Sequence, residues 1–529
     1  MKKILITDPL SEHGLEKLRK AEGIETIYRP ELSHTALLEI IPEVDALIVR
    51  SQTQVTAEVI RAGRRLKVIG RAGVGVDNID LTAATQQGII VVNAPDGNTI
   101  SAAEHTFALM ISLARQIPQA NYSLTQGKWE RKSFMGVELR GKNLGIIGLG
   151  RIGTELAKRA KAFQMKIYAY DPYLSAERAE KLGITSVSFD DLIRIADFIT
   201  IHTPLTNETR HMIDQQVLEK MKPSARIINC ARGGLIDEEA LYQALTEGRI
   251  AGAALDVFET EPPGEHPLFQ LPQVIATPHL GASTKEAQEN VALDVSEEVL
   301  HILRGQPFKN AVNLPSIPAD LVERLRPYQM LAEQLGLFAV QALSQAITKV
   351  KITYSGELYN LETSPLTRMV LKGILSTQLS SVNYVNAPYL AQERGIEVTE
   401  EKILGTRGFT NLITVEVTSH EVSCTVSGTT LNGMGPRIVN IDKYPIDVVP
   451  GGHLILIHHY DRPGAIGKVG TLLGAHGINI ATMQVGRQDI GGDAIMMLTI
   501  DKPIPKPVLE EIQQIEGIMK AKEIDLTLR

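Results

Sequence analysis

Residues 142–163 read KNLGIIGLGRIGTELAKRAKAF and carry the strongest fold signal of the chain. The apolar run LGII predicts a strand, TELAKRAKAF predicts a helix, and Gly148, Gly150 and Gly153 between them match the pattern G-x-G-x-x-G. Glycines in these places let the backbone approach a pyrophosphate bound at the N-terminus of the helix. The pattern alone is weak, but a preceding strand and a following helix are the context that a dinucleotide site requires.

The next predicted strand, KIYAY, leads into Asp171, which lies 18 residues after Gly153. A carboxylate in that place accepts hydrogen bonds from the hydroxyls of the adenosine ribose and repels a 2′-phosphate, so NAD is expected rather than NADP. The alternative is a purely structural turn in which Asp171 caps a loop. The motif and Asp171 together predict a Rossmann-type NAD site.

Short apolar strands and helical segments alternate on both sides of this unit. KILIT, ALIVR, LKVIG and IIVVN precede it, as does a helix at 101–116 in which Ser101 and Glu104 have the spacing of a capping box. FITIHTP, ARIINCARGG, GAALDVFE and QVIATPHLGAS follow it, and then a helix that ends at Gly305. Such alternation is typical of parallel strands covered by helices, so an α/β fold is predicted.

The second half of the chain has a different pattern. Residues 307–318, PFKNAVNLPSIP, contain three prolines and are interpreted as a linker. Residues 319 to about 450 predict a mixed α/β segment, with helices near 321–346 and 363–379 and the strand KVKITYSG between them. From LILIHHYD onward the order is β-α-β-β-α-β, which is ferredoxin-like.

Composition narrows the class of protein. The 529 residues are too many for one ordinary domain, and three or four are expected. A net charge of −7 and a pI of about 6.1 argue against a nucleic-acid binder. Only two cysteines, Cys230 and Cys424, occur, which argues against a disulfide framework and fits a reducing cytoplasm. No apolar run is long enough for a membrane span or a signal peptide.

Three charged residues follow strand-like segments downstream: Arg232 in IINCARGG, Glu261 in LDVFETEPP and His279 in VIATPHLGAS. Strand ends in such sheets meet at the cofactor crevice, so the three are expected to converge. Arg232 can grip a carboxylate by two parallel hydrogen bonds, His279 can move a proton near neutral pH, and Glu261 can hold the imidazole. Beside NAD this set suits hydride removal from a 2-hydroxy acid. Singly, each residue has a structural alternative, as a helix cap, a solvated turn or a structural histidine.

The motifs GLGRIG, NCARGG, LDVFETEPP and TPHLGAS together resemble those of the D-2-hydroxyacid dehydrogenase family. RAGVGVDNID, KWERKSFMG and HLGASTKEAQ are similar to the branch that acts on 3-phosphoglycerate, and the second half resembles its long form, so the resemblance covers essentially the whole chain. It implies a Rossmann-type NAD-binding domain inserted in a flavodoxin-like substrate-binding domain, then a mixed α/β intervening domain of the allosteric substrate-binding type and a ferredoxin-like ACT regulatory domain. The implied boundaries are 1–98 with 286–314 for the substrate-binding domain, 99–285 for the NAD-binding domain, 315–450 for the intervening domain and 453–529 for the ACT domain.

The resemblance implies catalytic roles for Arg232, Glu261 and His279, and no metal. It also implies NAD contacts at Val74, Gly148, Gly150, Arg151, Ile152, Gly153, Asp171, Thr203, Cys230, Ala231, Arg232, Asp256, His279, Leu280, Gly281 and Ala282. Val74 stands where many relatives carry threonine, which leaves a backbone contact there in place of a side-chain hydrogen bond. Cys230 would line the NAD site without a redox role.

A phosphorylated substrate needs cations beyond Arg232. Arg50 in VRSQT, Arg71 in GRAGV and Arg131 in KWERK sit at strand ends or in loops and are candidates to hold the phosphate. Ser51 is a further candidate for substrate binding, beside Arg232 and His279. The resemblance suggests that Arg131 in KWERK reaches the site of a neighbouring subunit in a homotetramer. The alternative for each of Arg50, Arg71 and Arg131 is ordinary surface charge. The implied reaction is the NAD-dependent oxidation of 3-phospho-D-glycerate that begins L-serine biosynthesis.

Two other functions stay open at this point. A related dehydrogenase would act on glycerate, hydroxypyruvate or 2-oxoglutarate; the regulatory second half argues against it, because an entry step of a pathway needs control. An NAD-binding corepressor shares this fold, and the acidic chain and its regulatory tail argue against it.

The segment HHYDRPGAIGKV predicts an amino-acid site in the C-terminal domain. The carboxylate of the ligand suits the free N–H groups at a helix start, and its ammonium suits Asp461. Asn479, after the helix, offers both a donor and an acceptor. The resemblance points to the same two positions, with domains paired across subunits and L-serine as the effector. Further candidates are His459 and Tyr460 for the effector, and Arg407, Arg437 and Lys443 for an anion in the preceding segment.

Overall fold

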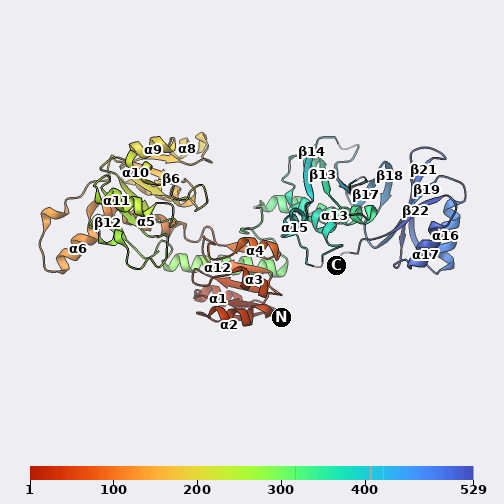
Figure 1. The fold of residues 1–529 in the computed structure, drawn as a ribbon, viewed down its shortest axis with the longest axis horizontal. Helices are drawn as coiled ribbons and strands as arrows, with labels where there is room; N and C mark the ends of the chain where they lie inside the picture. The colour runs from red at the N-terminus through yellow and green to blue at the C-terminus, as the bar shows by residue number, and fades with distance from the viewer. Residues whose placement is uncertain (316, 380, 406–407, 421, 528–529) are drawn as a thin grey trace.

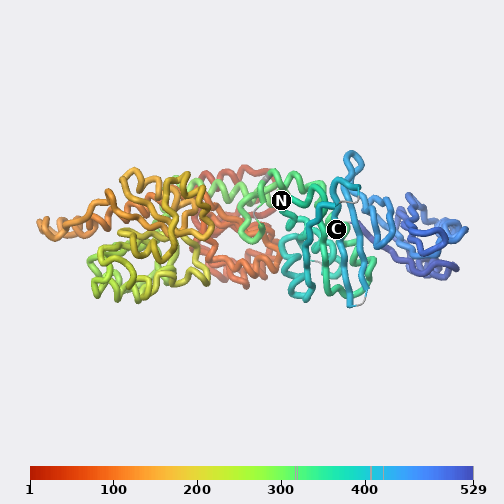
Figure 2. The backbone as a smooth tube through the Cα atoms, turned by 90° about the horizontal axis from the view of Figure 1, so that it is seen from above, coloured from red at the N-terminus to blue at the C-terminus, as the bar shows by residue number. Residues whose placement is uncertain are grey.

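The structure is a computed structural model that describes residues 1–315, 317–379, 381–405, 408–420 and 422–527. The chain is elongated, and four β-sheets with their helices lie along its long axis (Figures 1 and 2). Within the described residues, no helix combines the length and the apolar character that a membrane crossing requires.

The first sheet has five parallel strands in the flavodoxin-like order β2-β1-β3-β4-β5. The strands are β1 (Lys2–Ile6), β2 (Ile24–Tyr28), β3 (Ala46–Val49), β4 (Val68–Arg71) and β5 (Ile90–Asn93). On one face lie α2 (His34–Ile40), η1 (Ile41–Glu43), α3 (Ala57–Ala62) and α4 (Leu81–Gln86), and on the other α1 (Glu12–Arg19) and α12 (Lys285–Arg304). The distant helix α12 packs so closely that a Cβ on Gly70 would lie 2.7 Å from Val295. The chain therefore leaves this sheet, builds a second one and returns, as expected.

The second sheet has seven parallel strands in the order β12-β11-β10-β9-β6-β7-β8. They are β6 (Asn143–Ile147), β7 (Lys166–Tyr170), β8 (Thr185–Ser186), β9 (Phe198–Ile201), β10 (Arg226–Asn229), β11 (Gly252–Leu255) and β12 (Val274–Ala276). Its helices are α5 (Thr99–Arg115), α6 (Ile117–Thr125), η2 (Arg131–Phe134), α7 (Arg151–Ala162), α8 (Ala176–Leu182), α9 (Phe189–Ile195), α10 (Gln215–Lys220), α11 (Glu238–Thr246) and η3 (Pro267–Gln270). The predicted Rossmann-type fold is confirmed; the short exposed strand β8 was not predicted, because two residues show no alternation.

The third sheet is mixed, in the order β14-β13-β15-β16-β17-β18, with β13 and β14 parallel and the other pairs antiparallel. Its strands are β13 (Lys349–Gly356), β14 (Glu397–Ile403), β15 (Asn411–Thr418), β16 (Ser423–Leu431), β17 (Gly435–Ile441) and β18 (Tyr444–Val448). Its helices are α13 (Ala319–Leu343), η4 (Glu357–Asn360), α14 (Ser364–Leu375) and α15 (Ala387–Glu393). Helices α13 and α14 match the two that the sequence predicted, to within a few residues.

The fourth sheet is antiparallel, in the order β20-β21-β19-β22. Its elements are β19 (His453–Tyr460), α16 (Ala465–Ala475), β20 (Ile480–Arg487), β21 (Asp493–Ile500), α17 (Lys506–Gln513) and β22 (Ile518–Asp525), which confirms the ferredoxin-like order. One face of the sheet packs on α16 and α17. The other face, through Leu454, Leu456 and Met497, joins the hydrophobic core of the third sheet. The third and fourth sheets thus share one core, which the sequence did not reveal.

Candidate active site

The glycine motif forms a tight turn between β6 and α7. Gly148 has a φ of +90°, and a Cβ on it would lie 2.6 Å from the carbonyl oxygen of His202. A Cβ on Gly153 would lie 2.3 Å from the carbonyl oxygen of Gly148, whereas one on Gly150 would meet nothing within 4 Å. Gly150 is also the N-cap of α7 and gives no side-chain cap. The open space and the free N–H groups fit the pyrophosphate of a dinucleotide.

Asp171 lies beside this turn, directly after β7. Its Oδ2 accepts a hydrogen bond of 2.8 Å from the N–H of Leu149, and its Oδ1 accepts one of 2.8 Å from the N–H of Tyr173. The carboxylate is therefore fixed in direct contact with the glycine turn, which is the arrangement that a ribose-binding acid needs. Arg151, in the same turn, pairs with Asp96 over 2.6 Å.

A cavity of about 740 Å³ lies between the loops of the first and second sheets. Residues 50, 51, 71 and 74 line it from the first sheet, and residues 232, 261, 279 and 282 line it from the second. These are eight of the predicted catalytic, substrate and cofactor positions. Two chain segments that are far apart in sequence thus bring the predicted chemistry to one place.

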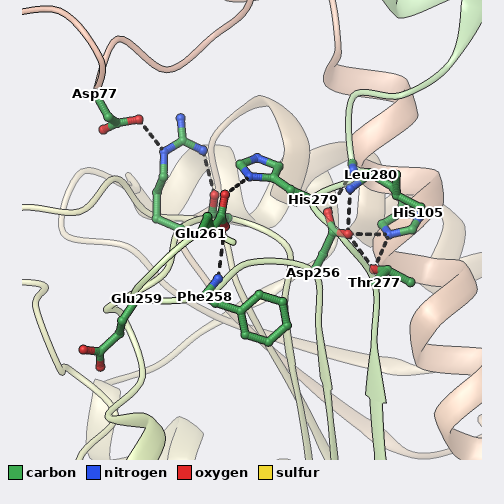
Figure 3. A network of polar contacts seen from close by, with 12 residues as sticks. Asp77, His105, Asp256, Phe258, Glu259, Glu261, Thr277, His279 and Leu280 are labelled. Carbon is green, nitrogen blue, oxygen red and sulfur yellow. Dashed lines mark hydrogen bonds and ion pairs between the residues drawn. The ribbon is translucent and has the colours of Figure 1, made fainter. Parts of the chain in front are cut away.

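His279 and Glu261 form a direct pair in this cavity (Figure 3). Nδ1 of His279 lies 2.7 Å from Oε2 of Glu261, whose Oε1 accepts a hydrogen bond of 3.1 Å from the N–H of Phe258. Burial alone would raise the pKa of Glu261, but the hydrogen bond and charge of His279 outweigh it and hold this pKa below its ordinary value. A charged Glu261 keeps the proton of the neutral imidazole on Nδ1 and leaves Nε2 free to act as a base.

Asp256, at the end of β11, holds the loop that carries His279. Its carboxylate accepts hydrogen bonds of 2.8 Å from the N–H groups of Leu280 and Gly281, and also contacts Thr277 at 2.5 Å and His105 at 3.1 Å (Figure 3). Burial tends to raise the pKa of Asp256, but these hydrogen bonds hold it below its ordinary value. The sequence analysis did not predict roles for His105 and Thr277. The one hint in the sequence was that His105 directly follows Glu104 and that Thr277 lies two positions before His279.

Three arginines approach one another in the cavity. Burial, and next the charges of Arg232 and Arg50, lower the pKa of Arg71 to about 10. Burial also lowers the pKa of Arg50, although Asp8 opposes the change. Among the described residues, the buried Nε atoms of Arg50 and Arg71 have no hydrogen-bond partner. Buried donors without partners are rare in folded proteins, so these two point to an anionic ligand.

Family models match three parts of the chain: the NAD-binding domain of D-isomer specific 2-hydroxyacid dehydrogenases at residues 107–281, the D-3-phosphoglycerate dehydrogenase intervening domain at 324–442, and the ACT domain at 453–517. D-3-phosphoglycerate dehydrogenases from Bacillus subtilis and Archaeoglobus fulgidus are 47% and 48% identical, each over 99% of this chain and 100% of the relative. The chain belongs to the D-3-phosphoglycerate dehydrogenase family.

Two solved structures each match a little over half of this family member. A glyoxylate reductase from Paecilomyes thermophila is 32% identical, with a TM-score of 0.54 over 59% of this chain and 98% of its own. D-Lactate dehydrogenase from Aquifex aeolicus, solved with NAD and lactic acid, is 29% identical, with a TM-score of 0.53 over 59% of this chain and 100% of its own. NAD is thus the cofactor of this oxidoreductase, as the glycine turn and Asp171 predicted.

The remaining predicted cofactor residues of this dehydrogenase lie at the carboxyl ends of strands in the second sheet. Thr203 follows β9 and contacts the sulfur of Met212 at 3.8 Å. Cys230 and Ala231 follow β10, and burial, with a smaller effect from Asp256, raises the pKa of the Cys230 thiol to about 12. His105, Cys230 and Asp256 place possible metal-ligand atoms within 4.8 Å of one another, and His105 and Asp256 contact each other directly at 3.1 Å. Ile152 lies in the first turn of α7, after the glycine turn.

Within one chain, Arg131 does not reach the cavity, and the two predicted effector residues, Asp461 and Asn479, do not lie next to each other. Arg131 lies in η2, exposed and outside the residues that line the cavity. Asp461 follows β19, where it pairs with Arg487 at 2.6 Å and accepts from the N–H of Gly491 at 3.2 Å. Asn479 precedes β20, whose first residue is level with the start of β19, so the two predicted effector residues flank opposite ends of the fourth sheet.

The other regulatory candidates are placed as follows. His459 is buried, with Nδ1 2.8 Å from the carbonyl oxygen of Tyr460. Arg437 donates to the carbonyl oxygens of Met434 and Pro436 and pairs with Asp447 at 3.3 Å, and Lys443 lies over the ring of Tyr444. Arg437 is thus already occupied, and Arg407 lies outside the described residues.

Proposed function

We propose that the protein oxidises 3-phospho-D-glycerate to 3-phosphooxypyruvate with NAD, as the first step of L-serine biosynthesis. The observation that supports this substrate is the clustering of Arg50 and Arg71, whose buried Nε atoms have no hydrogen-bond partner among the described residues, in the cavity of Arg232 and His279. A simple 2-hydroxy acid brings one carboxylate, which occupies one arginine. Three arginines fit a carboxylate together with a phosphate dianion.

The roles of the side chains follow from their places. Arg232 binds the carboxylate and fixes C2 of the substrate, while Arg50, Ser51 and Arg71 hold the phosphate. NAD, when bound, accepts the hydride from C2. His279 takes the hydroxyl proton at Nε2 as the hydride leaves. Glu261, 2.7 Å from Nδ1, stabilises the imidazolium that this step produces.

A steady-state assay with 3-phosphoglycerate and glycerate tests the substrate. The wild type should prefer 3-phosphoglycerate, and Arg71→Ala should lower kcat/KM for it by about 10- to 100-fold, the contribution of a charge-assisted hydrogen bond. The same variant should change kcat/KM for glycerate much less. A wild type that prefers glycerate, hydroxypyruvate or 2-oxoglutarate would overturn the assignment. Activity toward none of these 2-hydroxy or 2-oxo acids would favour a binding role such as that of a corepressor.

We infer a homo-oligomer from an apolar arm on the second sheet. Helix α6 projects from the body (Figure 1), and Tyr122, Leu124, Trp129 and Met135 on and after it are exposed by 55% or more. Such a patch marks a protein contact. Arg131 lies on the same arm, which supports its expected reach into a neighbouring site and a tetramer. Light scattering of the wild type and Trp129→Glu tests this, with a smaller assembly expected for the variant.

We also propose L-serine as an effector and the cytoplasm as the location. Within one subunit, Asp461 and Asn479 lie at opposite ends of the fourth sheet. A single ligand can therefore contact both residue types only where the fourth sheets of two subunits meet in opposite directions, so that Asp461 of one lies beside Asn479 of the other. The two cysteines without a disulfide fit a reducing compartment.

The domain boundaries that we propose are those predicted from the sequence: 1–98 with 286–314, 99–285, 315–450 and 453–529.

A further inference from the structure

We propose that Asp77 is a positioning residue for Arg232; this role rests on the proposed function of Arg232 in binding the substrate carboxylate. Asp77 lies in the loop after β4, and Arg232 lies in the turn after β10. Oδ2 of Asp77 accepts a hydrogen bond of 3.1 Å from Nε of Arg232 (Figure 3). The ion pair therefore reaches across the cavity, from the loops of the first sheet to those of the second.

The backbone of Arg232 is fixed by the second sheet alone. The side-chain amide of Asn229 donates to the carbonyl oxygen of Arg232 at 2.9 Å and accepts from the N–H of Ala231 at 3.0 Å. A Cβ on Gly233 would lie 1.8 Å from the carbonyl oxygen of Phe258, so the turn packs directly on the neighbouring backbone. The base of the arginine side chain is thus held, but these contacts leave its far end undefined.

Asp77 defines that far end. Arginine has five N–H donors, and the hydrogen bonds of Arg232 within the described chain use two of them: Nε to Asp77, and Nη1 to the carbonyl oxygen of Ala231 at 2.6 Å. Nη2 lies over Gly75, where a Cβ would come within 2.1 Å of it. The Nη1 and Nη2 edge stays available for a carboxylate, which needs two parallel donors.

The charges of the cavity explain why a carboxylate is useful there. The charges of Arg232 and Arg50 both act on Arg71, and repulsion between like charges tends to push the long side chain of Arg232 away from Arg71 toward water. The hydrogen bond to Asp77 holds Nε in place against this repulsion, on the side of the guanidinium that the substrate does not use. The pair is partly solvated, since 71% of the Asp77 side chain is exposed, so its contribution is to orientation rather than to a large binding energy.

Two substitutions separate this role from ordinary surface charge. Asp77→Ala removes the acceptor and should raise KM for 3-phosphoglycerate by about two- to fivefold, the size of an exposed ion pair, with kcat changed less. Asp77→Asn keeps an oxygen acceptor for Nε and should recover most of this loss. The affinity for NAD, measured by calorimetry without substrate, should stay at the wild-type value in both.

The control is Glu58→Ala, because Glu58 also forms an exposed ion pair on the first sheet, with His34 at 3.3 Å, but lies outside the cavity. An unchanged KM in Asp77→Ala would overturn the proposal, as would an equal rise in both Asp77 variants, which would assign the effect to charge alone. An inactive wild type would instead count against the proposed substrate, so the two failures are distinguishable.

Discussion

The N–H of His279 donates a hydrogen bond of 2.9 Å to the carbonyl oxygen of Asp256. The same aspartate accepts from the next two N–H groups of the chain through its side chain. The proposed base is therefore held at both its ends, by Glu261 at the ring and by Asp256 at the backbone. His279 has a φ of +54°, which is uncommon for a residue with a side chain, and these hydrogen bonds stabilise it.

Replacing the proposed base should abolish most of the turnover. His279→Ala is expected to lower kcat by about 10²- to 10⁴-fold, the usual contribution of a positioned general base, and to change NAD affinity little. Glu261→Gln should lower kcat as well and shift its pH profile, because the imidazolium loses a charged partner. His34→Ala, which alters an exposed His–Glu pair outside the cavity, is the control. Near-normal turnover of His279→Ala at every pH would exclude this residue from the mechanism.

Loss of the Asp256 carboxylate should destabilise the fold and disorder the catalytic loop. Asp256→Ala leaves several buried donors unpaired and should lower the free energy of unfolding by about 2–4 kcal/mol. Because the folded pKa of Asp256 lies below its ordinary value, its stabilisation is present above that value and is lost as the pH falls through the folded pKa. Urea titrations between pH 7 and pH 3 measure this, and the difference between wild type and variant should shrink at the acid end.

Asp171 should set the choice of cofactor. Asp171→Ala combined with Pro172→Arg is expected to raise the ratio of kcat/KM for NADP to that for NAD by about 10- to 100-fold, because repulsion of the 2′-phosphate is replaced by attraction. Asp171→Asn, which keeps an acceptor but no charge, should give an intermediate ratio. If the wild type already prefers NADP, Asp171 does not bind the ribose.

Both cysteines should resist alkylation in the folded protein. Burial raises the pKa of Cys230 and of Cys424 to about 12, so the reactive thiolate is scarce at pH 8. Because the folded pKa values are raised, burial of the two neutral thiols stabilises the fold fully at a pH below the pKa of an unfolded cysteine. This stabilisation is lost as the pH rises toward 12. Mass spectrometry after iodoacetamide treatment should find both residues labelled in urea and slowly labelled without it. Rapid native labelling of Cys230 would instead indicate an activated thiol.

L-Serine should bind the fourth sheet and inhibit the enzyme. Calorimetry is expected to detect binding to the wild type at millimolar serine, and to detect less in Asp461→Ala, which loses the partner of the ligand ammonium. Asp489→Ala, in the neighbouring loop, is the control. No binding to the wild type would remove the proposed effector, whereas binding without inhibition would keep the site and refute its coupling to the active site.

The sequence predicted those parts of the site that are formed by residues close to one another along the chain. The glycine turn, Asp171 and the strand ends that carry Arg232 and His279 are local signals, and each lies where its motif placed it. The contact of Asp77 with Arg232 spans 155 positions, and that of His105 with Asp256 spans 151. Such contacts depend on how two sheets or a helix and a sheet pack together, which periodicity does not report. The return of α12 to the first sheet was expected only from the family resemblance.

The core that the third and fourth sheets share has a consequence for how this protein unfolds. Removing the fourth sheet alone would take away Leu454, Leu456 and Met497 and leave the apolar side chains that they cover in the core of the third sheet exposed to water. Removing both, near residue 315, would cut the chain in a proline-containing segment and, of the described residues, would take only Val385 and its neighbours from the core of the first sheet. The solved relatives that match 59% of this chain over nearly their whole length have that smaller size. The two C-terminal sheets are thus expected to unfold together, as one cooperative unit.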